Sequence, residues 1–194
     1  MNIVQVNLFD TQGGAARIAG DITVAATAAG HQVVTFAHRK SSSDSNVIAL
    51  PFPGRSDFAK LMQHQQRHGY FDLFSAALLP MIDHDAFRKA DIVHLHCING
   101  GYFSYYLLPF LATKKLIWTF HDPLAITAQC LYPHRCNHWQ KHYCSECPID
   151  KNSGGPKLKR DTVQRIKEDV LRMLDFTVVV PSKWMENIAH EGIY

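Results

Sequence analysis

The chain has 194 residues, of which 46% are hydrophobic and 19% are charged, and its formal net charge is +3. This length and composition fit one globular domain with a sizeable core, and they exclude a disordered chain. The net charge is too small to indicate a nucleic-acid partner.

Short apolar runs alternate with helical patterns from the N-terminus onward. Strands are expected at residues 3–8, 33–37, 47–50, 92–96, 116–120 and 176–180, and helices at 15–29, 57–68, 83–90 and 104–112. A further helix is indicated by an apolar stripe at Val163, Ile166, Val170 and Leu174. Repeated strand–helix–strand units predict a doubly wound parallel α/β sheet of the Rossmann-like type. Residues 123–156 show no periodicity and are expected to form a long loop insertion in this domain.

Polar residues after the first strand suggest one candidate binding loop. Gly13 and Gly14 precede the first expected helix, and Arg17 lies in its first turn. Free amides at a helix N-terminus suit an anionic or polar ligand, but a tight turn without a ligand is an equal alternative. The segment is not a dinucleotide fingerprint, because the third glycine of that motif is missing.

Two later strands also end in polar residues. His94 and His96 should share one strand face, and Asn99 follows them at the expected ligand edge of the sheet. His121 and Asp122 follow the next strand. A histidine there can donate to a sugar hydroxyl or a phosphate, and Asp122 can orient its ring or accept a substrate hydroxyl. His94 and His96 could instead ligate a metal, but a hydrogen-bonded role bordering the crevice is favoured for them. A structural role is the alternative for the His121–Asp122 pair.

Four cysteines gather in the aperiodic segment: Cys130, Cys136, Cys144 and Cys147, with the spacing C-x5-C-x7-C-x2-C. In a cytoplasmic protein four thiolates can close a structural zinc site and order a long loop. We therefore favour zinc over paired disulfides or free thiols. A zinc-ribbon nucleic-acid protein is an alternative that the modest net charge disfavours.

Four segments in this order resemble the N-terminal domain of family 4 glycosyltransferases, which are retaining enzymes of the GT-B fold. They are Gly13-Gly14-Ala15-Ala16-Arg17, Asp91-Ile92-Val93-His94-Leu95-His96, Trp118-Thr119-Phe120-His121-Asp122 and Val180-Pro181-Ser182-Lys183-Trp184. The resemblance covers nearly the whole of residues 1–194. The cysteine segment is similar to that of a subgroup that builds exopolysaccharides such as colanic acid.

The resemblance implies a role for each matching residue. His121 would contact the donor sugar near the reacting centre, with Asp122 beside it as the second catalytic candidate. Gly13 and Gly14 would lie against the donor phosphates or the acceptor, and Arg17 would add a cation. His96 and Asn99 complete the expected substrate-binding set. The donor would be a UDP- or GDP-linked sugar, and the acceptor a saccharide or a lipid-linked saccharide. The chemistry requires no catalytic metal.

The resemblance also implies that the chain is one half of an enzyme. The C-terminal domain of the family, which carries most of the donor site, is expected to be absent from these 194 residues. Transfer by the chain alone is therefore not expected. A stand-alone module that binds a saccharide or a partner remains the main alternative, and a flavodoxin-like or nicotinamide-dependent redox protein is a weaker one.

The expected location is the cytoplasm, either free or in peripheral contact with the inner face of the membrane. The N-terminus lacks the pattern of a signal peptide, and the most apolar run, residues 102–111, is shorter than the roughly 20 residues that a bilayer requires. Basic residues at 157, 159 and 160 could touch anionic lipid.

Overall fold

The computed structural model describes residues 1–50, 57–70, 72–147 and 159–193. These residues contain a six-stranded sheet with the order β3-β2-β1-β4-β5-β6, in which all neighbouring strands are parallel. The expected doubly wound parallel α/β sheet is confirmed. Its strands are β1 (Asn2–Phe9), β2 (Gln32–Arg39), β3 (Val47–Ala49), β4 (Ile92–Leu95), β5 (Lys115–Thr119) and β6 (Phe176–Val179).

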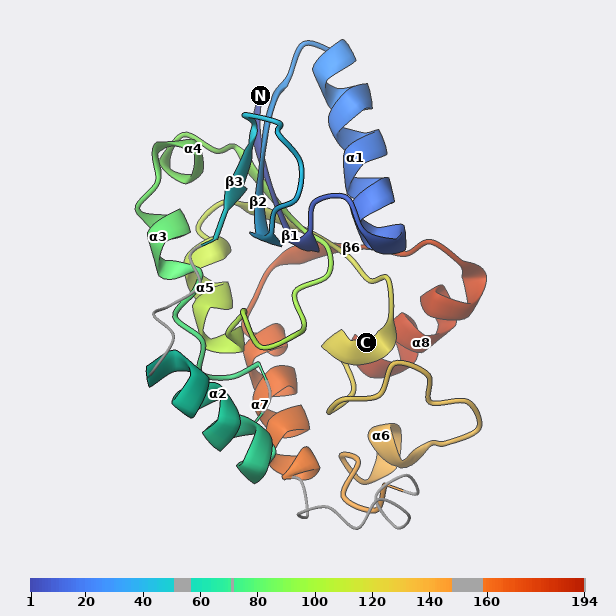
Figure 1. The fold of residues 1–194 in the computed structure, drawn as a ribbon. Coiled ribbons are helices and arrows are strands. Elements are labelled where there is room, and N and C mark those ends of the chain that lie inside the picture. Colours follow the sequence, from blue (N-terminus) through green and yellow to red (C-terminus); the bar gives the residue numbers. More distant parts are fainter. Residues whose placement is uncertain (51–56, 71, 148–158, 194) are drawn as a thin grey trace.

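Helices flank the sheet on both sides. α1 lies along one face and contacts β1 and β2, while α3, α4 and α5 lie on the opposite side (Figure 1). The helices are α1 (Gly13–Ala28), α2 (Asp57–His68), α3 (Leu79–Ile82), α4 (Asp85–Arg88), α5 (Leu108–Leu111), α6 (His138–Lys141), α7 (Arg160–Arg172) and α8 (Lys183–Ile193), with 3-10 turns η1 (Tyr105–Leu107) and η2 (Pro123–Ala125). No helix in the described ranges is long and apolar enough to cross a membrane.

The expected helix at 83–90 is wrong in its extent. His84 has extended backbone angles, and its Nδ1 accepts a hydrogen bond of 3.0 Å from the Ala86 amide, so α4 begins only at Asp85. A separate short helix, α3, precedes it and carries a proline in its first turn. The side-chain cap therefore sets the start of α4 two residues later than the sequence pattern predicts.

The expected long loop is confirmed in its described part. Between Pro123 and Cys147 the backbone forms only η2 and α6, and the remainder of the loop, 148–156, lies outside the described residues. The stripe on α7 is buried at Val163 and Val170, both at most 4% exposed, as the periodicity predicts.

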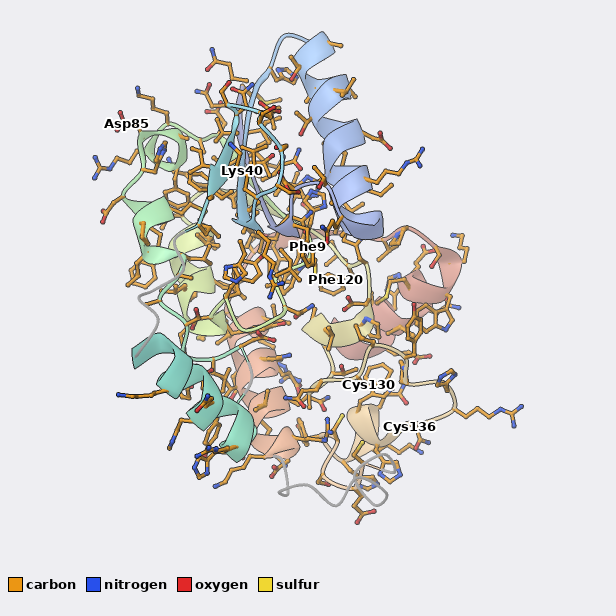
Figure 2. The ribbon with its side chains drawn as sticks, viewed as in Figure 1. Phe9, Lys40, Asp85, Phe120, Cys130 and Cys136 are labelled. Carbon is orange, nitrogen blue, oxygen red and sulfur yellow. The ribbon has the colours of Figure 1, made fainter. Side chains whose placement is uncertain are left out.

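One edge of the sheet receives the segments that follow β1, β4 and β5. The strand arrowheads point toward the middle of Figure 1, where these segments meet, and Phe9 and Phe120 mark the ends of β1 and β5 there (Figure 2). β1 lies between β2 and β4, so the chain order reverses at the β1–β4 pair. In doubly wound sheets such a reversal creates a crevice beyond the carboxyl ends of the strands.

Two glycines on different helices should respond to alanine in opposite directions. A Cβ at Gly192 of α8 would lie 2.7 Å from Ile126 Cδ1 and 3.1 Å from Trp139 Cζ3, whereas a Cβ at Gly20 of α1 meets no atom within 4 Å. Gly192→Ala should therefore lower the free energy of unfolding by about 1–3 kcal/mol through overpacking. Gly20→Ala should raise it by about 0.5–1 kcal/mol.

Urea denaturation of the two variants beside the unmodified chain measures both changes. An unchanged midpoint in Gly192→Ala would contradict the packing of α8 against the segment after β5.

Candidate functional site

Three histidines form a contiguous group at the carboxyl ends of β4 and β5. His94 Nε2 lies 2.8 Å from Thr119 Oγ1, and His96 Nδ1 lies 3.1 Å from His121 Nε2. The centres of the His94 and His96 rings are 4.2 Å apart, and those of His96 and His121 are 5.4 Å apart. The two strand histidines therefore share one face, as the alternation predicts.

Burial keeps these imidazoles uncharged. Desolvation, reinforced by the neighbouring histidines, lowers the pKa of His96 to about 2, and desolvation with the nearby His121 lowers that of His94 to about 4. The pKa of His121 is also lowered, by burial. At neutral pH the group acts through neutral ring nitrogens rather than as a cationic anion-binding site.

Four of the predicted site residues line one small cavity: His96, Asn99, His121 and Asp122. Its volume is about 10 Å³, which is space for roughly one water molecule. Two buried polar atoms here, His96 Nε2 and Asn99 Oδ1, have no hydrogen-bond partner in the described part of the chain. The cavity is thus polar and is much smaller than a sugar.

Asp122 orders the loop that follows β5. Its Oδ1 accepts a 2.9 Å hydrogen bond from the Leu124 amide and so caps η2. Burial raises the pKa of Asp122, while the Leu124 amide and the Lys167 ammonium act in the opposite direction. Within the described residues Asp122 does not bond to the His121 ring, so it holds the backbone beside His121 rather than the imidazole itself.

The glycine loop, Gly13 and Gly14, follows β1, which is the neighbour of β4. It therefore lies at the same edge of the sheet as the histidines. Gly13 has a φ of +84°, which a residue with a side chain adopts only with strain, and a Cβ at Gly14 would meet no atom within 4 Å. The first turn of α1 has no side-chain cap and no acidic residue, so its amides are available. Arg17 is exposed on this turn. β1 and β5 are two strand spacings apart, about 10 Å.

Asp10 anchors this loop, a role that the sequence analysis missed. Its carboxylate accepts hydrogen bonds of 2.9 and 3.1 Å from the Ser41 amide and of 2.8 Å from the Ser42 amide. Burial opposes ionisation, but the hydrogen bonds from Ser42 and Ser41 outweigh it and hold the pKa of Asp10 well below its usual range. The ends of β1 and β2 are thereby joined just before Gly13.

Lys167 of α7 is a second residue that the sequence analysis missed. It is 1% exposed, and its Nζ donates to the carbonyl oxygens of Leu124, Thr127 and Ala128 at 2.9, 3.3 and 3.1 Å. Nζ also lies 4.8 Å from the centre of the Tyr105 ring. The available signal was its position on the apolar stripe of α7, one turn after Val163.

Burial lowers the pKa of Lys167 to about 8, although the nearby carboxylates of Asp72 and Asp122 favour its charged form. Asp72 is itself buried, and its Oδ1 accepts a 2.7 Å hydrogen bond from the Gly101 amide. Lys167 therefore holds the loop after β5, which contains η2, through the carbonyl groups of that loop. Asp72 holds the loop after β4 through the Gly101 amide. These two loops flank the histidines.

The cysteine segment forms a separate feature. Cys130, Cys136, Cys144 and Cys147 all line one largely apolar cavity of about 260 Å³, and Figure 2 labels the first two below the sheet edge. All are free thiols. Burial, with a contribution from the other three thiols, raises the pKa of Cys144 to about 11. No group of three His, Cys, Asp or Glu side chains is placed to hold a metal ion in the ranges that the structure describes.

Backbone strain also concentrates in this segment. His134, Tyr143 and Cys144 have φ values of +47°, +50° and +57°. Residues with side chains adopt this region only where the surroundings hold them there. Tyr143 directly precedes the closely spaced pair of cysteines and Cys144 is its first member, so the turn that presents this pair is held in a specific shape.

The fold is that of a Rossmann-like α/β domain with a polar group at the carboxyl ends of β4 and β5, and the comparison with known families specifies it further. The family model described as Glycosyltransferase Family 4 matches residues 12–193. The chain therefore belongs to glycosyltransferase family 4.

Among solved structures, the chain is similar to a short-chain dehydrogenase/reductase superfamily protein from Agrobacterium tumefaciens with bound NAD. The TM-score is 0.41 and the sequence identity is 11%, over 91% of this chain and 48% of that one. The chain thus spans about half the length of that protein. No curated protein matches the sequence significantly.

Removing the buried ammonium of Lys167 should destabilise the domain strongly. Lys167→Met leaves three loop carbonyls without their donor and Asp72 without its nearby cation, at an expected cost of about 3–5 kcal/mol in unfolding free energy. Arg172→Met on the same helix removes only an exposed ion pair with Glu168 and should cost less than about 0.5 kcal/mol. Chemical denaturation compares the two, and equal effects would show that Lys167 has no special role.

Proposed function

We propose that this chain is the N-terminal, acceptor-side domain of a retaining GT-B glycosyltransferase. The enzyme would transfer a sugar from a UDP- or GDP-linked donor to a saccharide or lipid-linked acceptor, at the cytoplasmic face of the membrane, in surface polysaccharide assembly. Family membership and the neutral histidine group at the carboxyl ends of β4 and β5, next to the β1–β4 switch point, support the proposal. The exopolysaccharide pathway rests on the resemblance of the cysteine segment.

The position and the neutral state of the His121 ring are the main observations behind the proposal. Its ring is partly exposed at the crevice edge, and its neutral state favours hydrogen bonding to a sugar oxygen over binding of a phosphate by charge. The amides at Gly13 and Gly14, with the positive end of the α1 dipole, suit a diphosphate or a polar acceptor group. Arg17 would add a mobile cation at the same turn. These groups position the reactants and stabilise the leaving diphosphate.

The geometry of the crevice supports a substrate site that is completed by a second domain. A cavity of about 10 Å³ holds no sugar, and the glycine loop is open to solvent. A nucleotide sugar would therefore be enclosed only when another domain closes over the sheet edge, as the GT-B fold implies. On this proposal the 194-residue chain alone does not catalyse transfer.

The functional test is a transfer assay with labelled UDP- and GDP-sugars, with the 194-residue chain compared with the same chain joined to a C-terminal GT-B domain. Transfer is expected only from the two-domain protein. There, His121→Ala should lower kcat by roughly 10²–10³-fold, because a donor to developing charge is lost. The control His68→Ala removes an exposed imidazole from α2 and should leave kcat unchanged.

Two results would contradict this proposal. Turnover by the chain alone would show that the site needs no second domain. Saccharide affinity with no turnover, and with no gain from the added domain, would instead favour a stand-alone binding module.

We also propose that the cysteine segment binds one structural zinc ion. Four thiols around one cavity fit zinc in donor type, and the strained turn at Tyr143 and Cys144 supports a segment built to present sulfur ligands. The described arrangement is not a formed metal site. Binding would require the sulfurs to approach one another and to lose their protons. When bound, zinc would crosslink the loop and take no part in transfer.

Metal analysis of protein purified without chelators should find about one zinc per chain. Replacement by Co²⁺ should give thiolate-to-metal charge-transfer absorbance. Both signals should disappear in the double variant Cys144→Ser with Cys147→Ser and persist in the control Cys97→Ser, because Cys97 lies outside the segment. Five titratable thiols with far less than one metal per chain would overturn this assignment.

A further inference from the structure

We propose that a second binding site lies between α6, α7 and α8, apart from the histidine crevice, and that it takes a neutral saccharide. Its use as an anchor for a saccharide acceptor rests on the proposed function. The site itself rests only on the side chains that line it.

The site is an open cavity of about 520 Å³, within the range of about 300–1,000 Å³ that is usual for small-molecule sites. Its walls come from η2, α6, α7 and α8, and α8 contacts both η2 and α7 (Figure 1). Ala125 of η2 lines this cavity and also the small histidine cavity. The two cavities are therefore neighbours that share η2 as a wall.

Polar side chains from three helices are held in place at this cavity. Gln140 Nε2 of α6 donates a 2.6 Å hydrogen bond to Glu191 Oε2 of α8. Gln164 of α7 is 4% exposed, and its Nε2 donates to the Trp139 carbonyl oxygen. Side chains that are already fixed in this way lose little conformational freedom when a ligand binds.

These contacts leave hydrogen-bond acceptors in the lining. The Glu191 carboxylate has a second oxygen, and the Gln140 and Gln164 amides each keep a carbonyl oxygen. Glu168 adds another carboxylate, which pairs with Arg172. Water can satisfy all of these acceptors in the free protein. A ligand that replaces this water must bring several donors, and the hydroxyl groups of a saccharide do so.

The charges of the lining select against an anionic ligand. Glu168 and Glu191 contribute two negative charges, and Arg172 contributes one positive charge, so the described lining is net negative. The Arg172 guanidinium is already paired with Glu168, and the nearby Arg165 guanidinium lies 3.8 Å from the centre of the Tyr143 ring. A phosphate would be repelled here. A wholly apolar ligand would leave the carboxylates buried without partners.

Two aromatic side chains complete the lining. Trp139 is 6% exposed, and Tyr143 lies in the same lining. The Tyr143 backbone has a φ of +50°, which a residue with a side chain adopts only where its surroundings hold it. Aromatic surface packs against the C–H groups of a sugar ring, while polar groups beside it fix the orientation of the ligand. Together with the acceptors, this surface fits a neutral saccharide.

The test is a titration of the ¹⁵N-labelled 194-residue chain with cellobiose, lactose and maltose, followed by ¹H–¹⁵N NMR. At least one of them should shift the Trp139 indole N–H and the Gln140 and Gln164 side-chain amides, with a Kd on the order of 1 mM. The 1-phosphate of that disaccharide should bind at least about tenfold more weakly, because the lining is net negative. The Trp184 indole lies outside the cavity and should not shift.

Two variants of α8 locate the bound sugar. Glu191→Gln removes a charged acceptor from the lining and should weaken binding about tenfold. The control Glu186→Gln removes a carboxylate that pairs with Lys183 outside the cavity, and it should leave the Kd unchanged. Both glutamates are exposed, so both variants should fold like the unmodified chain.

Each result supports or overturns the proposal. Cavity signals that do not shift with any of the three disaccharides, up to saturating concentration, overturn it, and this measurement needs no variant. Equal affinity for the 1-phosphate overturns the choice of a neutral ligand. Binding that Glu191→Gln leaves unchanged places the sugar elsewhere. The titrations contain no nucleotide sugar and no second domain, so their outcome is separate from that of the transfer assay.

Discussion

Parallel pairing of β1, β4 and β5 is the constraint on which the site depends. Parallel strands send the segments that follow them to the same edge of a sheet, so residues far apart in sequence meet there. His96 and His121, which are 25 positions apart in the sequence, are brought within one hydrogen bond in this way. The same edge receives the glycine loop after β1, whose path is fixed by the hydrogen bonds of Asp10 to Ser41 and Ser42.

The loops at this edge are held by buried charge. Lys167 reaches from α7 to three carbonyl groups in the segment after β5, and Asp72 accepts a hydrogen bond from the Gly101 amide after β4. Neither side chain contacts the histidines directly. They determine where the backbone on either side of the histidines can lie, which explains why a lysine occupies an otherwise apolar helix face.

Much of the fold followed from periodicity, because each strand is short, apolar and bounded by polar or small residues. The ranges at β1, β2 and α2 were predicted closely, and so was the convergence of His96, Asn99, His121 and Asp122 on one edge. The start of α4 after His84 could not be predicted, since it depends on a ring nitrogen accepting from an amide two residues later. Lys167 and Asp72 were missed because a buried ion is defined by its partners, and these come from distant segments.

The burial of the histidine group also affects how the domain responds to acid. An unfolded chain takes up protons on its histidines near pH 6.5, whereas folding holds the pKa of His94 near 4 and that of His96 near 2. The unfolded state therefore binds more protons throughout this interval, and the folded state loses stability as the pH falls below about 6.5. The histidines that keep the crevice uncharged thus make the domain acid-labile.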